Sequence, residues 1–256
     1  MAVRRAWRVT GTVATVLGLI GAGVQTWAVA VQQQTTSVQS YDVAVHRLRL
    51  DTGSAAVRIR AGRDGHVVVR QNLDWTVRKP VVSATFEGDV LTVGMDCRQV
   101  LPVADFGCGA QIDLEVPAGT DVSGEVGSGS VQVEGLSGGV RMDLGSGQLR
   151  LVDISGEVYA HTGSGMVQGV DLSSGRVEVE RTSGALELSF AKAPRSVDAR
   201  TASGSLRMTL PTGTRYGFSG EAGSGSRHID PNLADSASPN RIHASVGSGS
   251  VTIDPS

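Results

Sequence analysis

The chain has 256 residues, of which 34 are glycine and 4% are aromatic, and its formal net charge is −2. Glycine inside a helix costs about 1 kcal/mol relative to alanine, and there is no Gly-X-Y period, so the composition argues against a mainly helical protein and against collagen. The 23 basic and 25 acidic residues are interspersed, which argues against a nucleic-acid partner because such binding needs a concentrated basic surface. The composition favours a β protein with many tight turns.

The N-terminal region predicts a membrane anchor. Residues 9–31 contain no charged side chain and would span about 35 Å as a helix, which is enough to cross a bilayer. Three arginines precede this run, so the positive-inside rule places residues 1–8 in the cytoplasm and the remainder of the chain outside the cell membrane. A cleaved signal peptide is the alternative, because Ala28-Val29-Ala30 fits the cleavage pattern. A twin-arginine signal at Arg4-Arg5 is a weaker one, since the surrounding pattern is missing.

The next segments predict a stalk and a β cap. Residues 32–40 are rich in Gln, Thr and Ser and indicate a short stalk. Residues 41–117 contain several short segments with alternating apolar and polar side chains, which predict an N-terminal β cap over the part that follows.

Cys97 and Cys108 are the only cysteines. Two thiols so close in sequence should pair in an oxidising compartment, although a reactive thiol is the alternative. Closing a loop of about ten residues would stabilise the fold by about 2 to 3 kcal/mol. Two cysteines alone cannot complete a tetrahedral zinc site, so we expect a disulfide.

A recurring Ser-Gly pair in residues 118–256 predicts a solenoid. The glycines of successive pairs are 18 to 24 residues apart, and a second set of Ser-Gly pairs divides the early periods into halves. Self-similarity at such a period is typical of proteins built from stacked repeats. The main pairs are Ser128-Gly129, Ser146-Gly147, Ser164-Gly165, Ser183-Gly184, Ser203-Gly204, Ser224-Gly225 and Ser248-Gly249.

Alignment of the repeats on these pairs gives columns that alternate between apolar and polar residues, as half-buried strands do. The inward column is expected to be Val122, Val140, Val158, Val177, Val197, Phe218 and Ile242. We therefore predict a parallel β-solenoid with in-register coils about 4.8 Å apart and a thin core that needs few aromatic side chains. An antiparallel meander closed by Gly-Ser-Gly hairpins is the alternative. A meander does not explain why the sequence similarity is stronger between full repeats than between half repeats.

These motifs resemble a known family. The Cys-bracketed loop, the Pro-Ala-Gly-Thr turn at the end of residues 112–120 and the repeated Gly-Ser-Gly-x-Val units are similar to the bacterial, actinobacterial-type putative-adhesin family of β-strand-repeat proteins. The resemblance covers about residues 41–254. It implies a non-enzymatic, envelope-exposed β-solenoid and supplies no catalytic residue.

Several motifs match a catalytic or binding pattern only in their letters. Residues 135–139 fit Gly-x-Ser-x-Gly, but a nucleophile elbow needs a following helix, and no helical pattern follows. The glycine-rich turns do not continue into the Lys-Ser/Thr pair of a phosphate loop, and the early coils lack the aspartates of a calcium-binding β-roll. We therefore expect no cofactor.

One polar column is a candidate site. Asp143, His161 and Glu180 could hold a divalent metal, or two carboxylates could act on a polysaccharide. We favour a solvated face with alternating charges, and Tyr159 is the only aromatic neighbour, which argues against a glycan enzyme and a high-affinity lectin. The full column is Glu125, Asp143, His161, Glu180, Arg200 and Glu221.

Two functions follow from the sequence. The first is a non-enzymatic, membrane-anchored interaction or structural module outside the cell membrane, whose partner is an unknown protein or an envelope glycan. The second is an extracellular polysaccharide-active β-helix enzyme.

Overall fold

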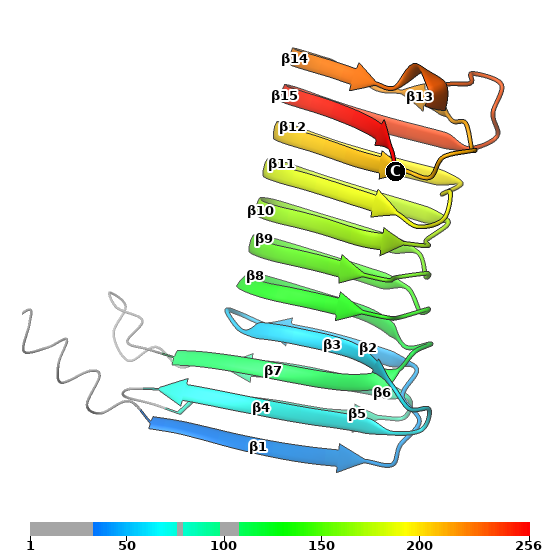
Figure 1. The fold of residues 1–256 in the computed structure, drawn as a ribbon. Helices are drawn as coiled ribbons and strands as arrows, with labels where there is room; N and C mark the ends of the chain where they lie inside the picture. The colour runs from blue at the N-terminus through cyan, green and yellow to red at the C-terminus, as the bar shows by residue number, and fades with distance from the viewer. Residues whose placement is uncertain (1–32, 76–78, 98–107) are drawn as a thin grey trace, which may run out of the picture.

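The computed structural model describes residues 33–75, 79–97 and 108–256. In this part of the chain, 15 strands form one sheet, and the helical content is a short 3-10 turn, η1 (Pro231–Leu233), which confirms the all-β class (Figure 1). The predicted cytoplasmic residues 1–8 and the predicted anchor at residues 9–31 lie outside the described residues. No helix within the described ranges is both long and apolar enough to span a membrane.

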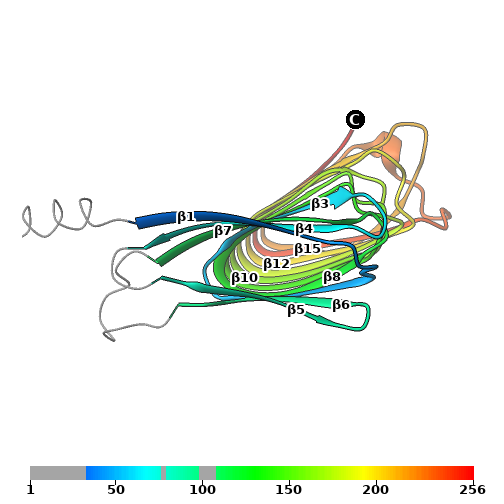
Figure 2. The same cartoon turned by 90° about the horizontal axis from the view of Figure 1, so that it is seen from below.

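The repeat region is a parallel solenoid, as predicted. Val158 pairs with Val140 on one side and with Val177 on the other, in register, so the meander is excluded. Each long strand bends near its Ser-Gly pair into a first arm and a second arm, and the nested bends are visible in Figure 2. The strands are β8 (Asp121–Glu134), β9 (Val140–Val152), β10 (Val158–Leu172), β11 (Arg176–Phe190), β12 (Ser196–Leu210) and β15 (Arg241–Pro255).

The core lies between the two arms. Six members of the predicted inward column are buried, and Phe218 is partly buried. The second arms contribute a matching set of buried side chains, which includes Leu149, Leu186 and Val251. Full burial of one such side chain contributes about 1.5 to 3 kcal/mol, so a thin core of aliphatic side chains holds the coils together.

The bends require glycine. Gly165 has a φ of 125°, and a Cβ atom at this position would lie 1.8 Å from the carbonyl oxygen of Gly147 in the preceding coil. No other residue fits so close to a neighbouring backbone, and a positive φ is unfavourable for residues that carry a Cβ. The Ser-Gly repeat is therefore the consequence of stacking sharp bends directly on one another.

The strand order at the C-terminal end differs from the sequential stacking that the repeat predicts. Strand β15 pairs with β12 and thereby separates it from the outermost coil, which consists of β13 (Gly217–Ser219) and β14 (Ala222–Ile229). Nearly every residue of β14 is exposed, whereas β15 buries five aliphatic side chains. The apolar strand thus takes the inner position and the polar coil the end.

Two strands from the predicted cap extend the solenoid at its other end. Strand β2 (Arg47–Thr52) pairs in parallel with the first arm of β8, and β3 (Ala56–Gly62) pairs with the second arm. The first-arm layer continues to β6 (Val90–Asp96) and β5 (Val81–Glu87). The second-arm layer continues to β7 (Cys108–Pro117), β4 (Val67–Trp75) and β1 (Gln33–Tyr41).

The prediction of a stalk at residues 32–40 is wrong from Gln33 onward. These residues form strand β1, which pairs antiparallel with β4 from Gln33↔Trp75 to Tyr41↔Val67. Thr35, Thr36 and Val38 are β-branched, and such residues favour an extended strand even where the strand is an exposed edge. Polar composition therefore indicated solvent exposure correctly but did not indicate a free segment.

The disulfide between the two cysteines stays a prediction. Cys97 directly follows β6, and Cys108 is the first residue of β7. Residues 98–107 between them and the side chain of Cys108 lie outside what the structure describes, so the Cys97–Cys108 disulfide is expected but untested.

Candidate functional site

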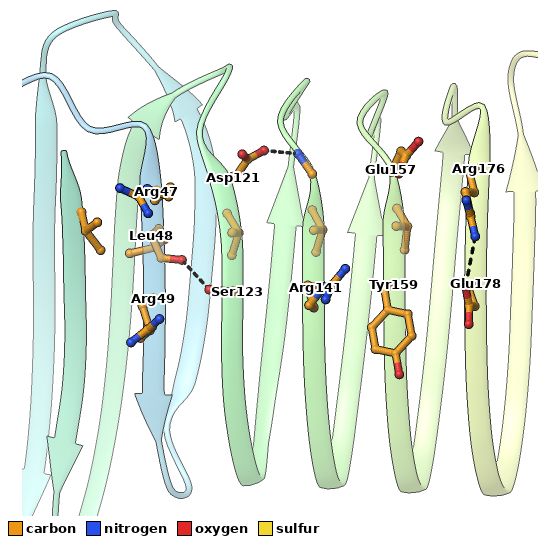
Figure 3. Close-up of a pocket in the computed structure, with 15 residues that line it drawn as sticks. Arg47, Leu48, Arg49, Asp121, Ser123, Arg141, Glu157, Tyr159, Arg176 and Glu178 are labelled. Carbon is orange, nitrogen blue, oxygen red and sulfur yellow. Dashed lines mark hydrogen bonds and ion pairs between the residues drawn. The ribbon is translucent and has the colours of Figure 1, made fainter.

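A groove of about 520 Å³ crosses the outer face of the first arms, and we call it the outer groove (Figure 3). It extends over strands β2, β8, β9, β10 and β11. Its lining residues are Arg47, Leu48, Arg49, Val90, Asp121, Val122, Ser123, Gly139, Val140, Arg141, Glu157, Val158, Tyr159, Arg176 and Glu178.

A row of side chains runs through the groove at right angles to the strands. Because every second residue of a strand faces outward and the strands pair in register, one residue of each strand contributes to this row. Figure 3 shows these side chains projecting from successive strands. The row is Arg49, Ser123, Arg141, Tyr159 and Glu178.

Several charged groups at the edge of the groove already have partners. An Arg47 Nη atom lies 2.8 Å from Asp89, and the hydrogen bond from Arg47 lowers the pKa of the Asp89 carboxyl below its usual value. The Asp121 carboxylate accepts a hydrogen bond of 2.7 Å from the backbone N–H of Gly139. These contacts hold the rim of the groove in place.

Two arginines in the row have no acidic partner within the described residues. Arg49 and Arg141 are both exposed, and neither takes part in the ion pairs found in this part of the chain. The guanidinium carbon of Arg141 lies 5.2 Å from the centre of the Tyr159 ring, close enough for a cation–π interaction. Both guanidinium groups keep their hydrogen-bond donors available for a ligand.

The column predicted from the sequence forms a second row beside the groove. Glu125, Asp143, His161, Glu180 and Arg200 stack in register on successive strands. Glu221 does not continue it: Ser245 of β15 stands next to Arg200 because β15 takes the inner position.

Four side chains of this second row lie in close pairs. His161 Nδ1 lies 3.3 Å from an Asp143 oxygen, and Arg200 lies 3.3 Å from Glu180 and 2.6 Å from Asp198. The side chains of Asp143, His161 and Glu180 are each 44 to 51% exposed. Across the described ranges, no three His, Cys, Asp or Glu side chains are close enough together to hold a metal ion. The row is therefore an exposed face of charged side chains, but its charges do not strictly alternate, because Glu125 and Asp143 are direct neighbours.

Ser137, the serine of the Gly-x-Ser-x-Gly match, belongs to the turn between β8 and β9. Its hydroxyl donates a hydrogen bond to the carbonyl oxygen of Ala118, and a strand follows it. A nucleophile elbow places its serine before a helix, so Ser137 has a structural role in this turn.

The sequence analysis did not identify the contribution of β2 to the outer groove. Arg49 is 74 residues away from Ser123 in the sequence, yet the two residues pair directly. The signal was the alternation of Leu48 and Leu50 with arginines, which matches the two inward columns of the repeat. Without a Ser-Gly pair at the expected place, that segment was assigned to a separate cap.

Comparison with solved structures finds matches of low identity. A "putative cell adhesion protein" from Clostridium sporogenes is 13% identical, with a TM-score of 0.45, over 88% of this chain and 100% of that one. A "putative adhesin" from Bacteroides fragilis is 10% identical, with a TM-score of 0.31, over 87% and 97% of the two chains. A "putative lipid binding protein" from Parabacteroides distasonis is 14% identical, with a TM-score of 0.31, over 87% and 97%.

No curated protein matches the chain. The family model described as Toastrack DUF4097 matches residues 110–255, which is more than half of the sequence and includes every repeat strand from β8 to β15. The actinobacterial origin expected from the resemblance stays a prediction. The chain belongs to the Toastrack DUF4097 family.

Proposed function

We propose that this protein is a non-enzymatic, adhesin-like interaction module that a single N-terminal helix holds at the outer face of the cell membrane. The observation that supports this proposal most strongly is the outer groove, in which charged, polar and aromatic side chains are aligned across five strands. Each of these positions is fixed by backbone pairing to its neighbours, so the groove presents a preorganised surface. Preorganisation lowers the entropic cost of binding.

The arrangement of the charges favours binding over catalysis. A glycosidase needs two carboxyl groups with different pKa values on either side of the scissile bond. Asp143 and Glu180 instead lie two strands apart on one exposed face, and each has a basic side chain, His161 or Arg200, at 3.3 Å. A polysaccharide-active enzyme is therefore the second candidate, and loss of a glycan-degrading activity in Asp143→Asn or Glu180→Gln would support it.

The position of β1 supports a module held close to the membrane. The predicted membrane-spanning run ends at Val31, and β1 begins at Gln33 already paired with β4. Two residues of extended chain span at most about 7 Å. If residues 9–31 cross the bilayer, the N-terminal end of the sheet therefore lies near the membrane surface and the solenoid extends from it.

Cysteine labelling in intact cells tests this proposal. A full-length Arg141→Cys variant should react with a membrane-impermeant maleimide before lysis, because residue 141 is exposed in the outer groove. An Ala2→Cys variant serves as the matched control and should react only after lysis, because residues 1–8 are predicted to be cytoplasmic. Labelling of residue 141 only after lysis would contradict the proposed location.

A further inference from the structure

We propose that the outer groove binds one end of an acidic polysaccharide in which a uronic acid alternates with a neutral sugar. The polymer lies along the solenoid axis, with successive carboxylates on Arg49 and Arg141 and a neutral sugar on Tyr159. This inference deepens the proposed function and rests on it, because only a domain outside the membrane can meet such a polymer.

Two arginines without an ion-pair partner favour an anionic group in the ligand. At the edge of the groove, Arg47 is neutralised by Asp89 and Arg176 lies 3.8 Å from Glu178. Arg49 and Arg141 have no such neighbour among the described residues and stay exposed. A guanidinium group offers a planar fork of donors that matches a carboxylate, so these two side chains form two candidate carboxylate sites.

The spacing of the two arginines selects an alternating polymer. They lie on β2 and β9, with β8 between them, so their backbones are about 10 Å apart at the usual strand separation. A disaccharide with one uronic acid repeats over a comparable length. Between the two arginines stands Ser123, whose hydroxyl donates to the carbonyl oxygen of Leu48 and which offers no charge to a third carboxylate. A polymer charged on every sugar would therefore place one carboxylate where no cation faces it.

Tyr159 and the acidic residues near it indicate that the ligand is a sugar polymer and limit where its carboxylates can bind. Tyr159 is half-buried, and Figure 3 shows its ring lying broadly along the outer face of the sheet, where a sugar ring can stack on it. Beyond it in the row comes Glu178, and the exposed Glu157 lies in the turn just before β10. These carboxylates repel an anion, and at the same spacing the next uronic acid would meet Glu178, so the neutral sugar at Tyr159 is expected to be the terminal sugar of the bound polymer. One aromatic platform and two arginines make a site of moderate affinity.

Binding of fluorescent hyaluronan oligosaccharides to the detergent-solubilised full-length protein tests this inference by anisotropy. Hyaluronan alternates glucuronic acid with an uncharged sugar. We expect Arg49→Gln and Arg141→Gln each to weaken binding about tenfold, which corresponds to one charge-assisted hydrogen bond. Tyr159→Ser should weaken it severalfold. Arg207→Gln is the matched control, since Arg207 is exposed on the second arm of β12, outside the groove, and should leave the affinity unchanged.

Three comparisons separate this inference from its alternatives. Carboxyl-reduced hyaluronan should bind at least tenfold more weakly, and oligogalacturonate, which is charged on every sugar, should bind no better than hyaluronan. Equal binding of the reduced polymer, or equal loss of affinity in Arg207→Gln, would overturn the inference. Tighter binding of poly-glutamate than of hyaluronan would indicate an acidic protein partner instead. If residue 141 is labelled on intact cells but the folded protein does not bind hyaluronan, the inference fails while the proposed location stands.

Discussion

Replacement of Arg181 by methionine is expected to stabilise the protein. Arg181 lies in β11 at an inward position, in register with Thr162 and Thr201 of the adjacent coils. Only 4% of its surface is exposed, and within the described residues none of its three guanidinium nitrogens has a hydrogen-bond partner. Burial also lowers the pKa of this guanidinium, which has the same physical cause: the charged form loses its hydration.

The size of the expected gain in the free energy of unfolding follows from the cost of burying a charge. After relaxation of the protein, the desolvation penalty is still several kcal/mol for each ion, and no carboxylate in the described part of the chain offsets it. Replacement of buried ionic groups by apolar ones of similar volume stabilises proteins by about 1 to 4 kcal/mol. Methionine is unbranched and about as long as the aliphatic stem of arginine, so it fills the same space without the charge. We expect a gain in the free energy of unfolding within this range.

Urea unfolding of the full-length protein, followed by circular dichroism, measures the effect. Arg207→Met on the neighbouring strand β12 is the control, because that side chain is exposed and its replacement should change the free energy of unfolding by less than about 0.5 kcal/mol. If Arg181→Met destabilises the protein by more than 1 kcal/mol, or if Arg207→Met stabilises it equally, the argument from desolvation is refuted.

The other predictions concern the core, the bends, the disulfide and the groove rim. Val158→Asp should destabilise the fold by several kcal/mol because it buries an unpaired charge, whereas Tyr159→Asp on the outer face should cost little; the midpoints of urea unfolding decide. Gly165→Ala should destabilise the fold more than Gly213→Ala, because both glycines have a positive φ but only at Gly165 would a Cβ meet a neighbouring backbone atom; equal losses would contradict the stacking of the bends. Non-reducing mass spectrometry of correctly localised protein should recover Cys97 linked to Cys108, and two free thiols would contradict this. Asp89 should titrate below its ordinary value of about 3.9, because Arg47 lowers its pKa; the ion pair then stabilises the fold above that value and this contribution is lost as the pH falls through the lowered pKa. Carboxyl NMR should show the midpoint return towards 3.9 in Arg47→Gln, and an unchanged midpoint would refute the assignment.

The repeat could be predicted from sequence because its cause is local. An alternating strand such as residues 158–162 and a bend that tolerates only glycine recur with nearly constant spacing, so the register follows from alignment on Gly147 and Gly165. The buried Arg181 could not be predicted, because a charged residue at an inward position contradicts the alternation on which the prediction depends.

The ends of the solenoid were harder to predict, because there strands that are far apart in the sequence compete for the same position in the sheet. The insertion of β15 beside β12 follows from the greater apolar content of β15 compared with β14. The spacing of the repeats alone does not predict which of these two strands pairs with β12. At the other end, β2 lacks a Ser-Gly pair at the expected place, so its pairing with β8 was not visible. The candidate site was therefore only half predicted: the column from Glu125 to Arg200 was found, but the groove that includes Arg49 was not.

The most direct test of the account is a cross-link between the two regions that build the outer groove. Residues 49 and 123 pair directly across β2 and β8, and in-register neighbours lie about 5 Å apart, within the Cα distance that a disulfide spans. A full-length Arg49→Cys/Ser123→Cys variant should therefore form an intramolecular disulfide under mild oxidation, and non-reducing peptide mapping should recover the linked peptides. An Arg49→Cys/Arg207→Cys variant, which places the second thiol on the second arm of β12, should not form one. Failure of the 49–123 pair to cross-link, with both thiols accessible and the protein folded, would contradict the groove as described.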